Sequence, residues 1–218
     1  MPHAELLPLT EQDLRRAADQ LATLDPDLAP LVERFGAPPL WAREPGYATL
    51  VHIILEQQVS LKAAGTMFKR LDAALAGVAP TTVLQCGQNG LRALGLTRQK
   101  ARYCHELARR VVDGELTLDN LHKRPEQEGR KALLAVPGLG PWSVDVYYLM
   151  ALRQPDIWPQ GDLALASALQ DVKGLPAPPS REQQQELAAP WSPWRAVAAR
   201  LLWAHYLAER GDHDMLNS

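Results

Sequence analysis

The stretch LLAVPGLGPWS, residues Leu133–Ser143, decides the fold of this chain. It predicts a helix, a tight glycine turn and a second helix. Gly138 and Gly140 allow positive φ angles and leave backbone N–H groups uncovered by side chains. Because a helix begins just after them, several unpaired N–H donors converge at one place, which suits a phosphate oxygen. An ordinary pair of helices joined by a glycine turn would show the same pattern.

A single acidic residue, Asp162, follows Gly140 by 22 residues, within the segment Pro159–Leu165. Since it stands after a glycine at the expected start of a helix, it fits the role of an ordinary N-cap. A phosphate clamp followed by one carboxylate would also suit a protein that holds DNA and cuts one bond in it.

The composition favours an all-α protein. Of the 218 residues, 46% are hydrophobic, with few Phe and Tyr and no alternating runs of β-branched residues. A chain of this length buries a core as one large domain or as two small lobes. The apolar runs are too short for a membrane span, and no signal peptide is evident. We therefore expect a cytoplasmic protein with no membrane partner, associated with the nucleoid if the source is bacterial.

Positive charge is concentrated in one part of the chain, although the net charge is −2. Between residues 62 and 110 there are nine basic residues and two acidic ones, a local charge of +7. The basic residues are Lys62, Lys69, Arg70, Arg92, Arg98, Lys100, Arg102, Arg109 and Arg110. A solvated helix face explains such a distribution, but we expect that part of this set contacts DNA phosphates.

Local signals predict where the helices begin and end. Thr10, Ser60, Thr97 and Asp162 are the expected N-caps of helices that run to about Leu24, Leu75, Val112 and Val172. Asp25 with Pro26, and Ser192 with Pro193, are expected to cap the helices that end near Gly36 and Glu209. Further helices are expected over about 47–57, 125–135 and 142–152, with short ones near Thr82 and Asn89, and a loop over 174–180.

Four segments, in order, resemble the helix-hairpin-helix DNA glycosylase superfamily. Within it they most resemble a compact form of the 3-methyladenine DNA glycosylase II, or alkylbase DNA glycosylase, branch. The segments are Ile53–Ala64, Val136–Trp142, Pro159–Leu165 and Pro193–Trp203, and the resemblance spans residues 47–203. A PGxG hairpin alone occurs in many nucleic-acid-binding proteins, whereas four ordered segments with the carboxylate in place are specific.

The resemblance implies an all-α, two-lobed helix-hairpin-helix glycosylase fold with a cleft between the lobes. One lobe would be discontinuous and formed from both termini, residues 1–46 and 151–218. The other, residues 47–150, would be a helical barrel that ends in the helix-hairpin-helix.

The resemblance also assigns the chemistry to Asp162. A carboxylate beside C1′ of the sugar stabilises the oxocarbenium-like state through which an N-glycosidic bond breaks, and it can position the attacking water. Trp142 stands where bifunctional relatives place a lysine that forms a Schiff base. Because an indole cannot do this, the match implies a monofunctional enzyme that leaves an abasic site.

Trp142 and Trp203 match two tryptophans that line the base pocket of the family's methylpurine enzymes. An indole face attracts a cationic methylated purine by about 0.5–2 kcal/mol. Val146 stands where some relatives have a tyrosine, which makes the pocket less aromatic, and Tyr47 is a weaker candidate for the same pocket. Core tryptophans on amphipathic helices would give the same pattern, above all at Trp203.

In the family the hairpin, here Pro137–Gly140, grips the DNA backbone. It often holds a monovalent cation, sodium or potassium, through main-chain carbonyls, which here would be those of Leu134, Val136 and Leu139. The family also fills the gap left by an extruded base with the side chain at the position of Gln58. A polar turn between two helices is the alternative interpretation of Gln58 and its neighbours.

The predicted function is that of a monofunctional DNA glycosylase that removes alkylated purines, such as 3-methyladenine and 7-methylguanine, from double-stranded DNA and so starts base-excision repair. A glycosylase for deaminated or mismatched bases, or a non-catalytic DNA-damage-binding protein, would be the alternatives; the second has no need of Asp162. We expect a monomer that requires no cofactor beyond the hairpin cation. Two cysteines, Cys86 and Cys104, cannot supply the four ligands of the iron–sulfur cluster that some relatives carry.

Overall fold

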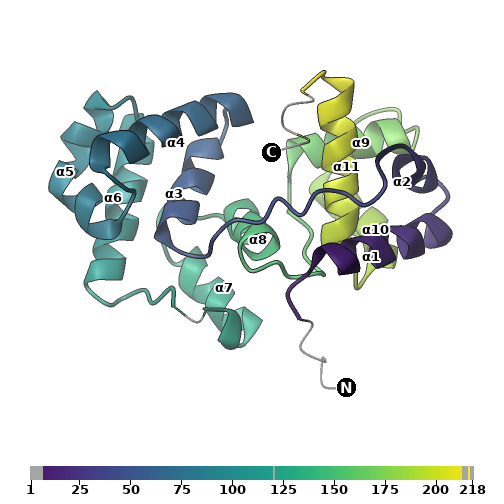
Figure 1. The fold of residues 1–218 in the computed structure, drawn as a ribbon, viewed down its shortest axis with the longest axis horizontal. Coiled ribbons are helices and arrows are strands. Elements are labelled where there is room, and N and C mark those ends of the chain that lie inside the picture. Colours follow the sequence, from purple (N-terminus) through teal and green to yellow (C-terminus); the bar gives the residue numbers. More distant parts are fainter. Residues whose placement is uncertain (1–6, 120, 213–215, 217–218) are drawn as a thin grey trace. The chain divides into compact units, whose positions relative to one another are not determined.

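The computed structural model describes residues 7–119, 121–212 and 216 (Figure 1). These residues contain helices and no β-strand, which confirms the predicted all-α class. The α-helices are α1 (Glu11–Leu24), α2 (Ala29–Phe35), α3 (Tyr47–Glu56), α4 (Leu61–Leu75), α5 (Pro80–Ala93), α6 (Arg98–Val112), α7 (Glu126–Leu134), α8 (Pro141–Met150), α9 (Leu163–Val172), α10 (Arg181–Ala188) and α11 (Arg195–Glu209). Two short 3₁₀ helices, η1 (Leu121–Lys123) and η2 (Ala189–Trp191), lie between them. Within the described ranges, no helix combines the length and the apolar character that a bilayer span requires.

The helices group into two compact units. Unit 1 comprises Met1–Ala42 and Tyr148–Ser218, and unit 2 comprises Arg43–Tyr147. The division that the resemblance implies has its boundaries after residues 46 and 150, whereas the structure divides the chain after Ala42 and Tyr147. In the structure the second boundary falls inside α8, whose last three residues belong to unit 1.

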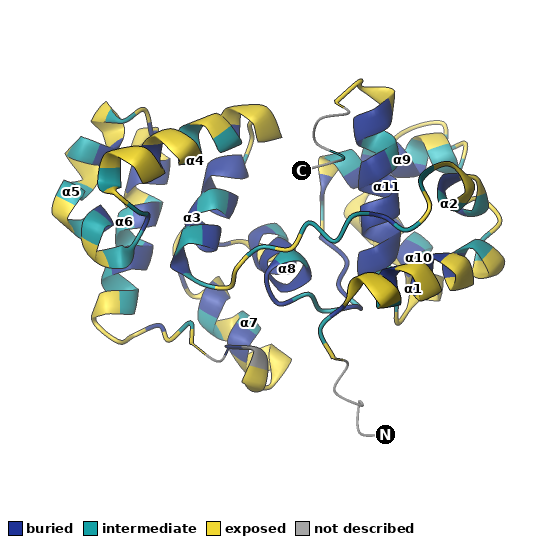
Figure 2. Ribbon diagram, viewed as in Figure 1, coloured by how far each residue is buried: buried dark blue, intermediate teal, exposed yellow. Residues whose placement is uncertain are grey.

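Unit 1 is built around α11. From Ala196 to Ala204 every residue of this helix is at most 9% exposed, and Figure 2 shows it dark blue over most of its length. Helices α1, α2 and α9 pack against it. A helix that is apolar on all sides has to be enclosed, so the others present their apolar stripes to it.

Unit 2 is built around α3, whose residues from Leu50 to Leu55, apart from His52, are fully buried. Helices α4 and α6 pack against α3, and α5 packs against α6. The Tyr47 hydroxyl donates a hydrogen bond to the main-chain oxygen of Cys104 on α6, at 2.9 Å. Burial raises the pKa of the Cys104 thiol to about 12, so this cysteine stays protonated.

Local signals locate most helix ends correctly. Thr10, Ser60, Thr97 and Asp162 are each observed as the N-cap, and each accepts a hydrogen bond from the amide three residues later. The two short helices expected near Thr82 and Asn89 form α5, which is interrupted by a non-helical residue at position 87. Helix α10, which follows the expected loop, is an element that the sequence analysis does not predict.

Two expected caps are wrong: neither side chain caps the expected helix, and each binds a distant partner. Ser192 donates a hydrogen bond to Asp156 at 2.9 Å, and α11 begins later, at Arg195. The Asp25 carboxylate accepts a 2.7 Å hydrogen bond from Lys173, at the end of α9, and a 2.8 Å one from the Trp191 indole. Helix α2 accordingly begins at Ala29 without a side-chain cap.

We predict that Asp25→Asn lowers the free energy of unfolding by about 2 kcal/mol at neutral pH, because a half-buried charged hydrogen bond is lost. Burial alone would raise the pKa of Asp25, but the bonds from Lys173 and Trp191 outweigh it and hold this pKa below its ordinary value of 3.8. A lowered pKa stabilises the fold above pH 3.8 and ceases to do so as the pH falls through the folded-state value. The difference between variant and wild type should therefore shrink in acid.

Urea unfolding at a series of pH values measures this difference. Asp19→Asn, an exposed aspartate on α1, is the matched control and should differ little from wild type at any pH. A constant difference between Asp25→Asn and wild type across the series would contradict the ion-pair explanation.

Candidate functional site

Asp162 is held in one orientation at the start of α9. The turn that leads to it is closed by a 3.4 Å hydrogen bond from the Asp162 amide to the Pro159 carbonyl, and Gly161, at its third position, has a φ of +71° that favours glycine. The Asp162 Oδ1 atom accepts the amide of Leu165 at 2.9 Å, and only 8% of the residue is exposed. The aspartate is thus a real N-cap, and the cap also fixes its carboxylate.

The Trp203 side chain binds the same carboxylate. Its indole Nε1 donates a hydrogen bond to Asp162 Oδ1 at 3.2 Å, and the residue is 9% exposed. The ring of Trp41 meets the Trp203 ring edge-on, with 6.4 Å between centroids and an interplanar angle of 60°. Unit 1 therefore brings together the predicted catalytic residue and one predicted pocket tryptophan, and adds Trp41, which the sequence analysis does not single out.

The hairpin of unit 2 packs on Tyr103, a residue of α6. Gly138 has a φ of +95°, and a Cβ there would lie 2.3 Å from the Tyr103 ring. Val136 and Leu139 are buried on either side of this glycine, as expected of residues that anchor the turn. Glycine is therefore required at position 138 both by the backbone angle and by the close approach of the ring.

The second hairpin glycine differs from the prediction. Gly140 does not have a positive φ, and a Cβ there would meet no atom within 4 Å. Neither the backbone nor the packing of the protein requires glycine at this exposed position. The open space beside it is accessible to a ligand that approaches the main chain.

An ion pair joins the two helices of the hairpin. Arg130 of α7 lies 2.6 Å from the Asp145 carboxylate of α8, and the Asp145 side chain is 3% exposed. Arg130 also binds Glu126 one turn earlier, at 2.6 Å. Both helices therefore enter the turn at a fixed angle.

A glutamine from another element binds the same hairpin. Gln57, which follows α3, donates from Nε2 to the Gly138 carbonyl at 2.8 Å and to the Ser143 hydroxyl at 2.9 Å. Two residues before Gln57, the Leu55 carbonyl accepts a hydrogen bond from the Lys100 ammonium group at 2.7 Å. These bonds fix the turn after α3 relative to the hairpin, a connection that two adjacent glutamines in a sequence do not reveal.

Gln58 is the exposed member of the pair. Its φ of +59° is uncommon for a residue other than glycine and is the kind of outlier that gathers at functional sites. With Gln57 bound to the hairpin, the chain has to reverse at Gln58 before Ser60 caps α4. The residue predicted to act as the wedge is thus the one that this turn presents to solvent.

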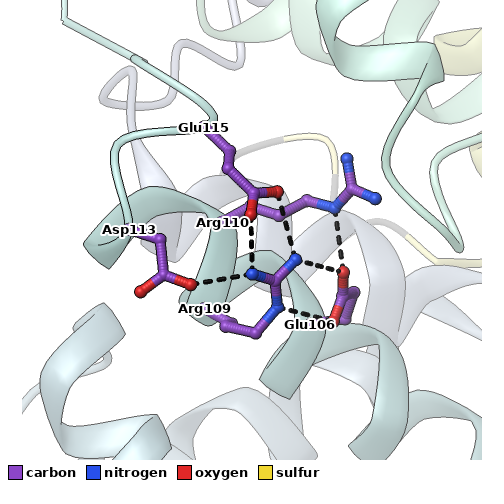
Figure 3. Close-up of polar contacts among 5 residues, drawn as sticks. All are labelled: Glu106, Arg109, Arg110, Asp113 and Glu115. Atoms are coloured by element: carbon purple, nitrogen blue, oxygen red, sulfur yellow. Dashed lines mark hydrogen bonds and ion pairs between the residues drawn. The ribbon is translucent and has the colours of Figure 1, made fainter.

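The basic stretch divides into two sets. Arg109 forms ion pairs with Glu106, Asp113 and Glu115, and Arg110 binds Glu106 (Figure 3). These hydrogen bonds lower the pKa of Glu106 to about 2. Lys100 is buried, and burial lowers its pKa.

The other six basic side chains are exposed. They are Lys62, Lys69, Arg70, Arg92, Arg98 and Arg102. In the part of the chain that the structure describes, none of them has a carboxylate oxygen within 4 Å of its charged nitrogen atoms. These six side chains are the exposed basic groups of the stretch, and Lys62 and Arg70 border an open depression on α4, of about 370 Å³, that begins at Ser60.

The remaining predicted pocket residues belong to unit 2. Trp142 is half-buried at the start of α8, whereas Val146 and Tyr47 are 2% and 6% exposed and pack in the core of that unit. Their contacts with a base stay predictions. Among the described residues, no group of three or more His, Cys, Asp or Glu side chains is placed to hold a metal ion.

The sequence matches a known family over most of its length. A family model described as "HhH-GPD superfamily base excision DNA repair protein" matches residues 51–193. The chain is 32% identical over 208 residues to a probable bifunctional transcriptional activator/DNA repair enzyme AlkA of Mycobacterium tuberculosis, covering 84% of this chain and 41% of that protein. It is 25% identical over 184 residues to the putative DNA-3-methyladenine glycosylase YfjP of Bacillus subtilis, covering 81% and 64%. The chain thus spans less than two thirds of the length of either relative.

Solved structures share the fold. The Schizosaccharomyces pombe 3-methyladenine DNA glycosylase Mag1, in complex with abasic DNA, matches with a TM-score of 0.81 at 23% identity, covering 86% of this chain and 95% of that one. The 3-methyladenine DNA-glycosylase of Archaeoglobus fulgidus matches with a TM-score of 0.75 at 22% identity, covering 90% and 69%. These matches confirm the predicted helix-hairpin-helix glycosylase fold class.

We predict that the two hairpin glycines differ sharply in their tolerance of a methyl group. Gly138→Ala combines backbone strain with a clash against Tyr103 and should lower the free energy of unfolding by about 3 kcal/mol or more, a fall in Tm of roughly 6–12 °C. Gly140→Ala meets open space and should change the stability by less than about 0.5 kcal/mol. Thermal and urea unfolding of both variants test this, and equal losses would contradict the assignment of Gly138 as the packed glycine.

Proposed function

The chain belongs to the HhH-GPD superfamily of base excision DNA repair proteins, and on that premise we propose that it hydrolyses the N-glycosidic bond of alkylated purines in double-stranded DNA. The substrates would be of the 3-methyladenine and 7-methylguanine type, and the product an abasic site that starts base-excision repair. The observation that carries the proposal is the Asp162 carboxylate, held by the Leu165 amide and the Trp203 indole. The names of the relatives support the substrate class.

The main requirement of the proposed reaction is a carboxylate held in a fixed position. The bond between C1′ and the base nitrogen breaks, and its electron pair leaves with the base, which neutralises the positive charge of an alkylated purine. Positive charge then develops on C1′ and the ring oxygen, where a fixed carboxylate stabilises it. A water oxygen bonds to C1′, and its proton passes to Asp162 or to solvent.

Trp142 supports hydrolysis without strand cleavage. Cleavage through a Schiff base requires an amine that attacks C1′. The hairpin of this chain ends in an indole where bifunctional relatives have a lysine, so water is the nucleophile in the proposed reaction. An indole face also favours a cationic base over a neutral one.

Unit 2 would hold the DNA. The open main chain at Gly140 suits the approach of a phosphate, and Gln58 would fill the gap that the extruded base leaves. The carbonyls of Leu134, Val136 and Leu139 would hold a sodium or potassium ion, which adds positive charge next to the phosphate. The Val136 oxygen already accepts the Leu139 amide at 3.1 Å, and its second lone pair suits such a hard cation.

We predict that Asp162→Asn lowers the rate of 7-methylguanine release from methylated duplex DNA by about 100-fold or more, because the developing charge loses its counter-charge. Asparagine caps a helix as well as aspartate does, so the variant should keep nearly the wild-type Tm. Asp171→Asn, an exposed aspartate on the same helix, is the control and should release base at the wild-type rate. Release by Asp162→Asn at the wild-type rate would remove Asp162 from the mechanism, and a wild-type protein that releases no base would favour a damage-binding protein.

The absence of the hairpin lysine gives a separate prediction. Wild-type protein incubated with methylated duplex DNA and borohydride should form no covalent protein–DNA adduct, and the product strand should break only after treatment with alkali. Denaturing gels of protein and of end-labelled DNA measure both results. An adduct trapped by borohydride would show an amine nucleophile and contradict the monofunctional mechanism.

A further inference from the structure

Trp41 adopts a backbone conformation that bulky residues rarely take. Its φ is +44°, in the left-handed region. A residue of this kind persists only where its surroundings hold it, and such outliers gather at binding and catalytic sites. Its side chain is half-buried, and it lies in the segment between α2 and α3, where no helix requires the strained angle. The residues that hold Trp41, and the side chain that its ring contacts, therefore indicate its role.

A fully buried arginine fixes the peptide next to Trp41. Arg200 of α11 donates from Nε to the Leu40 carbonyl at 3.0 Å, and from its two terminal nitrogens to the carbonyls of Ala196 and Leu149, at 3.0 and 2.8 Å. No carboxylate within the described residues lies within 4 Å of its guanidinium nitrogens. Burying a charge without a counter-charge is costly, so the fold bears a cost to hold this segment.

The ring that is held in this way lies next to the candidate catalytic residue. Arg200 and Trp203 are three residues apart on α11 and so share one face of the helix. Trp41 meets the Trp203 ring edge-on at 6.4 Å, and Trp203 donates its indole N–H to Asp162 at 3.2 Å. The strained tryptophan thus belongs to the same cluster of side chains as the carboxylate, entirely within unit 1.

We propose that Trp41 is a specificity-determining residue, a second indole surface beside the Asp162–Trp203 pair on which the extruded alkylated base stacks. This inference rests on the proposed glycosylase function. An alkylated purine in DNA is cationic, and the face of an indole attracts a cation more strongly than the ring of any other side chain. Trp41 therefore favours alkylated bases over the neutral bases that vastly outnumber them.

The competing explanation is that Trp41 merely supports Trp203. An edge-to-face partner stabilises the ring that it touches, and its loss would displace Trp203 and then Asp162. The two explanations depend on different properties of the indole. Support depends on the shape of the ring, whereas attraction of a cation depends on the electron density of its face.

The first part of the test replaces the ring. Trp41→Leu should lower the single-turnover rate of 7-methylguanine release by about 2- to 30-fold, the range that a cation–π contact supplies, and Trp41→Phe by less. Affinity for duplex DNA with an abasic site, which has no base to stack, should stay unchanged in both variants. Trp194→Leu is the matched control, because Trp194 is a half-buried tryptophan of the same unit that binds Gln20 and Arg16 instead.

The second part changes the electron density and keeps the shape. Singly and doubly fluorinated tryptophan placed at residue 41 alone should lower the release rate stepwise, with the Tm unchanged. If the wild type is active and the Trp41→Leu and fluorinated proteins release base at the same rate, this inference is overturned and the proposed function stays intact. A loss that does not depend on fluorination, or that follows the Tm, would also overturn it. A wild type that releases no base would overturn both.

Discussion

The enclosure of α11 is the constraint on which unit 1 depends. A helix that is apolar on every side is stable only inside a protein, so α1, α2 and α9 must surround it. Polar groups that α11 carries into this interior need particular partners. Arg200 takes main-chain carbonyls and Trp203 takes the Asp162 carboxylate. The position of the candidate catalytic residue is therefore a consequence of how a hydrophobic helix is buried.

In unit 2, polar main-chain groups at the end of the buried helix α3 also need partners. The carbonyls at the C-terminus of α3 need donors, and the chain that leaves it has to reverse direction. Lys100 supplies one donor, and the Gln57 side chain ties the turn to the hairpin. Gln58 then takes up the strained angle. One set of hydrogen bonds thus both fixes the turn after α3 to the hairpin and leaves the Gln58 side chain exposed.

The sequence predicts those features that depend on neighbours along the chain. The caps at Ser60 and Asp162 and the positive φ of Gly138 are local, and the structure confirms each of them. The two wrong helix caps, Asp25 and Ser192, concern side chains that bind partners far away in the sequence. Asp25 binds Lys173, 148 residues away, and does not cap α2, because a half-buried charged hydrogen bond is stronger than a cap at the surface. The proposed role of Trp41 depends on its contact with Trp203, 162 positions further along the chain, and no local pattern reveals that contact.

The burial of Cys104 has a consequence for a protein that would work where DNA is being methylated. Methylating chemicals attack thiolates as well as bases, and the reactive form of cysteine is the thiolate. Cys104 is fully enclosed beneath α3, and its thiol keeps its proton. The damage that supplies the proposed substrate would therefore spare this cysteine in the core of the protein proposed to remove it.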